Sequence, residues 1–124
     1  MALANIGEGT QAAVIGTEHI VLASTTGKTY VFIVDTQNMV NGDILELRAY
    51  LGPLAADSAQ ANSECCYFVS YSNIQGNAAA PGSSASGPVV KISPPIPALI
   101  RADFTLRQTA GTGRNFDWKV LSID

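Results

Sequence analysis

The chain has 124 residues, a net charge of −3 and only 14% charged residues, against about 25% in a typical soluble domain. Its length suits one domain with a buried core, and its seven Lys and Arg residues are too scattered to form the basic surface that nucleic acid requires. No apolar run approaches the ~20 residues of a membrane helix, so we expect neither nucleic acid nor a membrane as partner. The low charge predicts a neutral exterior, which either packs against other proteins at little desolvation cost or faces water as an ordinary polar surface.

The first nine residues are small and glycine-punctuated, and their sizeable apolar side chains are Leu3 and Ile6. They lack the basic start and the apolar core of a signal peptide, which indicates a protein kept in a cytoplasm or assembled there into something larger. We expect residues 1–9 to form an N-terminal arm, ordered only where Leu3 and Ile6 dock on a neighbour. A single domain is expected to follow over residues 10–124.

Strands are predicted along this domain by alternating apolar and polar residues and by runs of β-favouring side chains. Residues 29–35 (TYVFIVD) are apolar on both faces, which is typical of a central strand covered on both sides. Two loops interrupt the pattern at 52–62 and 75–88, and loops as long as the second, which carries no charge, are usually functional or mobile. Prolines in residues 93–97 indicate an extended connection. Further strands are predicted at residues 11–15, 18–23, 43–51, 63–73 and 89–92.

The C-terminal part predicts a β-hairpin. Residues 100–109 and 115–123 both alternate with a period of two, and the glycines within 110–114 suit a reversal of the chain. Leu121 and Ile123 break the alternation, which indicates either burial on both faces or a bulge. The hairpin is expected to anchor the core through its aromatic side chains, Phe104, Phe116 and Trp118. Seven or eight strands with turn signals about every ten residues together predict an all-β fold, an antiparallel β-sandwich, most simply a jelly roll.

Residues that carry catalysis or bind metals are few. The single His19 leaves no choice of base for a catalytic triad and excludes a site with several histidines. Cys65 and Cys66 are adjacent, so they suit neither a structural disulfide nor the spaced ligand pairs of a zinc site. We expect one of these cysteines to be buried and the other half-buried, and both to remain reduced.

Carboxylates and glycines give no stronger signal. Asp35, Asp43 and Glu46 are the nearest candidates for a catalytic pair, but none has a partner at a motif spacing, and Asp is common in turns. Residues 111–114 (GTGR) suggest a phosphate loop only superficially, because the GxxxxGK[ST] pattern and a following helix are both missing, and a hairpin turn is the favoured interpretation. We expect no cofactor, no metal and no enzymatic activity.

Tyrosines leave one alternative open. Tyr50, Tyr67 and Tyr71 would form a sugar-stacking platform if they shared a face of the sandwich, as in a carbohydrate- or receptor-binding domain of a phage tail or fibre. Coverage of the core is the more common role of aromatic residues on strands.

Two segments carry a resemblance to a known group of proteins. Residues 34–48 (VDTQNMVNGDILELR) and 105–121 (TLRQTAGTGRNFDWKVL) resemble small virion proteins of tailed bacteriophages, in particular head decoration, or cement, proteins. The resemblance implies a β-sandwich that clusters, commonly as a homotrimer, on the capsid exterior. It also implies binding to the major capsid protein where capsomers meet, after assembly in the cytoplasm of the host bacterium.

The leading hypothesis is therefore a structural virion protein that stabilises a phage capsid by burying neutral surface. The arm and the loops at 52–62 and 75–88 are the expected contact surfaces. The residues predicted to lie in the interface are Leu3, Ile6, Leu54, Asn77, Pro81 and Pro95.

Overall fold

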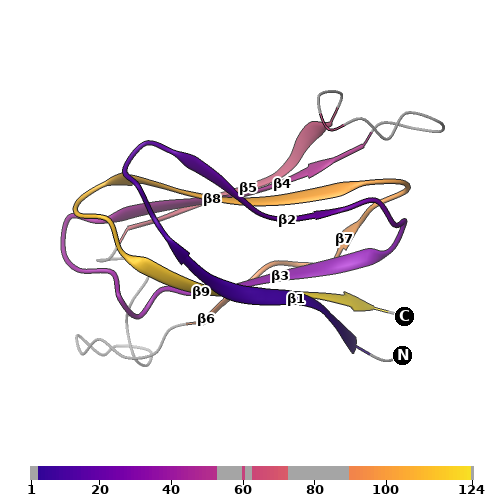
Figure 1. Ribbon diagram of the computed structural model, residues 1–124, viewed down its shortest axis with the longest axis horizontal. Helices are drawn as coiled ribbons and strands as arrows, with labels where there is room; N and C mark the ends of the chain where they lie inside the picture. The colour runs from indigo at the N-terminus through magenta and orange to yellow at the C-terminus, as the bar shows by residue number, and fades with distance from the viewer. Residues whose placement is uncertain (1–2, 53–59, 61–62, 73–89, 124) are drawn as a thin grey trace.

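The protein is described by a computed structural model that covers residues 3–52, 60, 63–72 and 90–123. Within these residues nine β-strands form two antiparallel sheets that lie face to face (Figure 1). In the same part of the chain no helix has the length and apolar character needed to cross a membrane.

The strand order is that of a jelly roll. Sheet A contains, in order, β1 (Leu3–Ala12), β9 (Asn115–Ile123), β3 (Thr29–Asp35) and β6 (Val90–Ile92), and β7 (Ile96–Pro97) also pairs with β3. Sheet B contains, in order, β2 (Glu18–Ser24), β8 (Ala102–Ala110), β4 (Ile44–Leu51) and β5 (Glu64–Ser72). The pairs β1 and β2, β9 and β8, β3 and β4, and β6 and β5 therefore occupy matching positions in the two sheets, and the predicted jelly-roll-like β-sandwich is confirmed.

The core lies between the two sheets and is centred on aromatic side chains. Tyr30 and Phe32 of β3 project from sheet A toward Phe104 of sheet B, with ring centroids 5.5 and 5.3 Å apart. Alternation places every second residue of the central strands β3 and β4 in this layer, as the sequence pattern predicts for β4. Phe104, Phe116 and Trp118 all belong to or pack against the core, as expected for the C-terminal strands.

The predicted C-terminal hairpin is wrong, although both of its strands are present. β8 belongs to sheet B and β9 to sheet A, so residues 111–114 cross from one layer to the other. A short connection that contains glycine is compatible with a hairpin and with a crossing between sheets. The alternation of apolar and polar residues in each strand does not indicate which sheet the strand joins.

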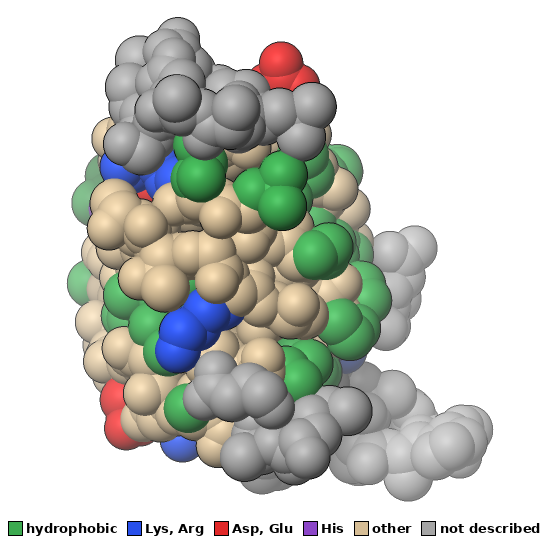
Figure 2. Space-filling model, turned by 90° about the vertical axis from the view of Figure 1, so that its right-hand side faces the viewer, with side chains coloured by type: hydrophobic (Ala, Val, Ile, Leu, Met, Phe, Trp, Pro, Cys, Tyr) green, Lys and Arg blue, Asp and Glu red, His purple; other side chains and the backbone are tan. Residues whose placement is uncertain are grey.

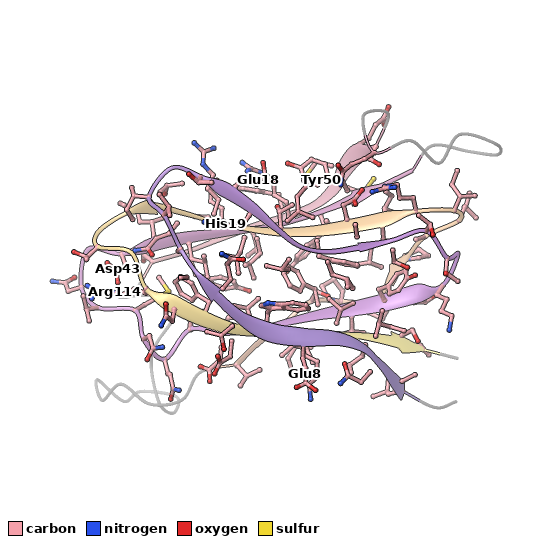
Figure 3. The ribbon with its side chains drawn as sticks, viewed as in Figure 1. Glu8, Glu18, His19, Asp43, Tyr50 and Arg114 are labelled. Atoms are coloured by element: carbon pink, nitrogen blue, oxygen red, sulfur yellow. The ribbon has the colours of Figure 1, made fainter. Side chains whose placement is uncertain are left out.

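The crossing is held by buried polar contacts at one end of the sandwich. Gln108, fully buried, donates through Nε2 to the carbonyl oxygens of Ala110 and Thr112 and accepts from the backbone N–H of Arg114. Arg114 Nε then donates to Asp43 Oδ2 over 2.9 Å, and Figure 3 shows the two side chains together. These contacts tie the connection to the start of β4.

The predicted N-terminal arm is also corrected. Residues 3–12 form β1, which pairs along its length with β9 of the same chain, with a register shift between Asn5 and Gly7. The glycines that suggested an arm have a packing role here, because a Cβ on Gly7 would lie 3.0 Å from Leu22 Cδ1 and a Cβ on Gly9 would lie 3.3 Å from the indole nitrogen of Trp118. The strand is ordered by its own domain, and no neighbour is needed to place it.

Candidate interaction surfaces

The outer side of sheet A is unusually apolar for a sheet face turned away from the core. The register of the strands places the side chains of this surface side by side across the sheet. Leu3 and Thr29 lie on either side of Ile123, and Leu121 lies opposite Val31. We call this surface the apolar face, and its apolar side chains are Leu3, Val31, Ile33, Val90, Ile92, Leu121 and Ile123.

Several of these side chains are open to solvent. Leu3 and Ile92 are each 62% exposed and Val90 is 51% exposed, while the residues of the central strands are half-buried by their neighbours. The structure therefore corrects the expectation that residues 29–35 are covered on both sides, because among the described residues nothing lies over the outer side of β3. It also explains why Leu121 and Ile123 break the apolar–polar alternation. Both side chains point outward on the apolar face, and β9 pairs with β3 without a bulge.

One end of the apolar face is acidic. Asp35 of β3 and Asp117 of β9 lie directly opposite each other in the ladder. Around them is a hollow of about 520 Å³, whose lining includes Ile33 and Val90 as well as charged side chains. The carboxylate of Glu8, which Figure 3 shows directed away from the core, lies 3.7 Å from Lys119 Nζ.

The outer side of sheet B has a different character, because its outward residues are mostly polar or charged. Arg48 lies 3.1 Å from Glu46 and 3.8 Å from Glu18, and its guanidinium is also 5.0 Å from the ring centre of Phe68. Arg48 is therefore paired with acids of its own sheet.

A second hollow, of about 270 Å³, lies on sheet B around Glu18 and Tyr50. The hydroxyls of Tyr50 and Thr105 both donate to Glu18 Oε2 over 2.6 Å. Burial would by itself raise the pKa of Glu18, but these two hydrogen bonds and the positive charge of Arg48 outweigh it and hold the pKa below its ordinary value. Burial together with the neighbouring carboxylate raises the pKa of Tyr50 to about 12.

Asp103, the other acid of the second hollow, accepts hydrogen bonds from donors of the same chain. Arg101 contacts Asp103 through two nitrogens, at 2.8 and 2.9 Å, and the hydrogen bond raises the pKa of Arg101. Gln60 donates to the same carboxylate over 3.0 Å. This arrangement satisfies a buried carboxylate, which is a structural role.

The predicted interface residues are only partly accessible as expected. Leu3 and Pro95 are exposed, whereas Ile6 lies at the register shift of β1, is partly buried and packs against the core. Leu54, Asn77 and Pro81 lie outside the described residues, as do most of the loops to which they belong.

The structure does not assemble the tyrosine platform. Tyr67 and Tyr71 pack against the core, where burial and the adjacent Tyr71 raise the pKa of Tyr67 to about 12. Tyr50 lies opposite Asp103 in the β4–β8 ladder, and both side chains line the second hollow on the outer side of sheet B. The predicted carboxylates are likewise separated, because Asp43 is buried, whereas Asp35 and Glu46 belong to different sheets.

The remaining candidates are placed apart from one another. His19 Nε2 accepts a hydrogen bond from the backbone N–H of Val14 over 3.1 Å. Cys65 and Cys66 are both exposed, which corrects the expected burial, and a register shift of β5 against β4 at Tyr50 changes the alternation there. Among the described residues no three His, Cys, Asp or Glu side chains are grouped as metal ligands would be.

Sequence reasoning missed the apolar face, although the signals were present. The apolar residues on both sides of 29–35 and the break at Leu121 and Ile123 each marked an outward apolar position. Taken together they indicate one continuous surface only once β3 and β9 are known to be neighbours.

Comparisons with known proteins give little further information. No protein-family model matches the sequence, and no curated protein matches it. Among solved structures, the chain is similar to part of a chain in the structure of infectious bursal disease virus, Gx strain, with a TM-score of 0.43 and 11% sequence identity. The match covers 98% of this chain and 33% of that chain, so the present chain spans about one third of its length. A match at this level does not assign a role to the chain.

Proposed function

We propose that this chain is a non-enzymatic structural protein of a phage virion, which binds the major capsid protein on the capsid exterior and stabilises the shell. The observation that carries the proposal is the apolar face of sheet A, with Leu3 and Ile92 more than half exposed. Exposed apolar surface of this extent is characteristic of protein interaction sites. The resemblance of residues 34–48 and 105–121 to decoration proteins supports the kind of partner.

The proposed mechanism is mass action. A protein that binds only the assembled, expanded shell stabilises that shell by its free energy of binding, multiplied over many copies. The free energy comes from removing apolar side chains from water at a surface with few ions to desolvate. Figure 2, which looks onto one end of the sandwich and not onto the apolar face, shows few charged groups among hydrophobic and uncharged atoms there. Homotrimer formation, as the resemblance implies, would multiply the contacts of each copy.

The proposal is tested by adding purified protein to capsids made by a phage from which the gene for this chain is deleted, and measuring co-sedimentation. Wild-type protein is expected to bind to saturation. Ile92→Glu is expected to weaken binding by about tenfold or more, because it places an unpaired charge in an apolar contact.

Leu99→Glu is the matched control, because Leu99 is as exposed as Ile92, at 63% against 62%, but precedes β8 and does not belong to the apolar face. This variant is expected to bind like the wild type. Wild-type protein that stays in the supernatant, or equal losses for the two variants, would contradict the proposal.

A further inference from the structure

The acidic end of the apolar face carries more negative charge than its neighbours neutralise. The hollow is lined by the carboxylates of Glu8, Asp35 and Asp117 and by one ammonium group, that of Lys119. Lys119 lies 3.7 Å from Glu8 on the side of β1, away from β3. Within the described part of the chain, Asp35 and Asp117 have only neutral hydrogen-bond donors.

Those neutral donors fix the carboxylates without cancelling their charge. Thr10 Oγ1 donates to Asp117 Oδ1 over 2.5 Å, and the backbone N–H of Gln37 donates to Asp35 Oδ1 over 2.9 Å. Like charges placed directly opposite on neighbouring antiparallel strands destabilise a sheet. A positively charged group from outside would remove this cost when it binds.

The walls of the hollow suit a long aliphatic stem. Ile33 precedes Asp35 on the same side of β3, and Val90 of β6 lies opposite Asp35. Both line the hollow. Lysine and arginine side chains combine such a stem with a terminal charge, and they commonly lay the stem along apolar surface.

We propose that the protein surface covering the apolar face inserts a lysine or arginine side chain between Asp35 and Asp117. This inference rests on the proposed function and adds the chemistry of the partner: an apolar patch with one cationic side chain at its edge. The stem lies along Ile33 and Val90, and the charge meets the two carboxylates. The negative pair then selects this partner over a neutral apolar surface.

The charge pattern disfavours a second copy of the chain on this face. A twofold axis parallel to the strands would place Asp35 and Asp117 of one copy over the same carboxylates of the other. An axis perpendicular to the strands, within the interface, would place them over Leu3 and Ile123 at the opposite end of the face. Both arrangements bury unpaired charge, which disfavours a twofold homodimer formed through this face.

The test uses capsids from the gene-deleted phage and measures binding over a range of salt concentrations. The double variant Asp35→Asn/Asp117→Asn keeps the acceptor oxygens for Thr10 and Gln37 but loses both charges. It is expected to bind at least about tenfold more weakly than the wild type and with a flatter dependence on salt. Glu64→Gln, which neutralises an exposed carboxylate on β5 of sheet B, is the control and is expected to bind unchanged.

A second variant, Asp117→Lys, separates binding from folding. It supplies a cation opposite Asp35, so its urea unfolding midpoint is expected to rise while capsid binding falls by more than for the double variant. Binding of Asp35→Asn/Asp117→Asn at wild-type affinity and salt dependence, with Ile92→Glu still impaired, would overturn the cation inference alone. Absence of wild-type binding would overturn the proposed function together with the inference.

Discussion

Asp35 on β3 and Asp117 on β9 face each other across the central ladder of sheet A. Side chains directly opposite on antiparallel strands lie about 5 Å apart, close enough for two like charges to repel. The same ladder places Val31 against Leu121 two rows away. The central strands therefore present a carboxylate pair and an apolar pair on one surface, which is a pattern expected of a binding face rather than of a water-facing sheet.

Removing one of these charges is expected to stabilise the free protein. Asp117→Asn should raise the free energy of unfolding by about 0.2–1 kcal/mol, because the repulsion ends while the acceptor for Thr10 remains. Urea unfolding at neutral pH and low salt checks this value. The gain should shrink at high salt as screening weakens the repulsion in the wild type. A clear loss of stability at low salt would show that the pair is not repulsive.

Gly111 is expected to be intolerant of any side chain. It adopts φ +90°, and a Cβ there would occupy the position of Asp43 Oδ1, displacing the carboxylate that pairs with Arg114. Gly111→Ala should lower the free energy of unfolding by more than the ~1 kcal/mol typical of Ala at a positive φ.

Gly16→Ala is the control for backbone strain alone, because Gly16 has φ +84° and nothing within 4 Å of an added Cβ. Thermal or urea unfolding of both variants gives the contribution of the buried pair as the difference between them. Equal losses for the two substitutions would mean that the carboxylate moves aside at no cost.

Acid stability is expected to depend on Glu18. Its pKa in the folded protein lies below the ordinary value of 4.5, so its charged form stabilises the fold at pH above 4.5, and this contribution is lost as the pH falls through the lowered pKa. The stability difference between wild type and Glu18→Gln should therefore shrink as the pH falls below 4.5. Tyr50→Phe removes one hydrogen bond to the carboxylate and should shift this loss toward higher pH. Unfolding measured across the acid range, with a carboxyl NMR titration, checks both shifts.

Both cysteine thiols are expected to react in the folded protein. Cys65 and Cys66 are exposed on the edge strand β5, so a thiol reagent such as Ellman's reagent should modify both without denaturant. Serine at either position should reduce the number of reactive thiols to one. Slow modification that denaturant accelerates would place at least one thiol in the interior.

Much of the fold could be predicted because alternation is a local property. The pattern of residues 29–35 and 43–51 gave strands that differ little from β3 and β4, and the sandwich followed from the number of such strands. Pairing between strands is not local. The sequence of residues 111–114 is compatible with a crossing between sheets and with a hairpin. The partners of β8 and β9 therefore could not be predicted from the sequence.

The first strand was missed for a related reason. Gly7 and Gly9 lower the strand preference of residues 3–12. The role of Gly9 depends on Trp118, which lies more than a hundred residues away, and the role of Gly7 depends on Leu22 of β2. Glycines within an extended segment can signal close approach of a large side chain, and the single tryptophan of the chain was the one to consider. The apolar face was missed because it is divided between β1, β3, β6 and β9, none of which shows it alone.

The central claim is that another protein covers the outer side of sheet A, and oxidative footprinting of the chain free and in purified virions tests it most directly. The claim predicts that Leu3 and Ile92, each 62% exposed in the free chain, become protected in the virion, while Phe68 on the outer side of sheet B, 52% exposed, is protected less. Equal oxidation of Leu3 and Ile92 in the two states, or protection of Phe68 instead, would contradict it.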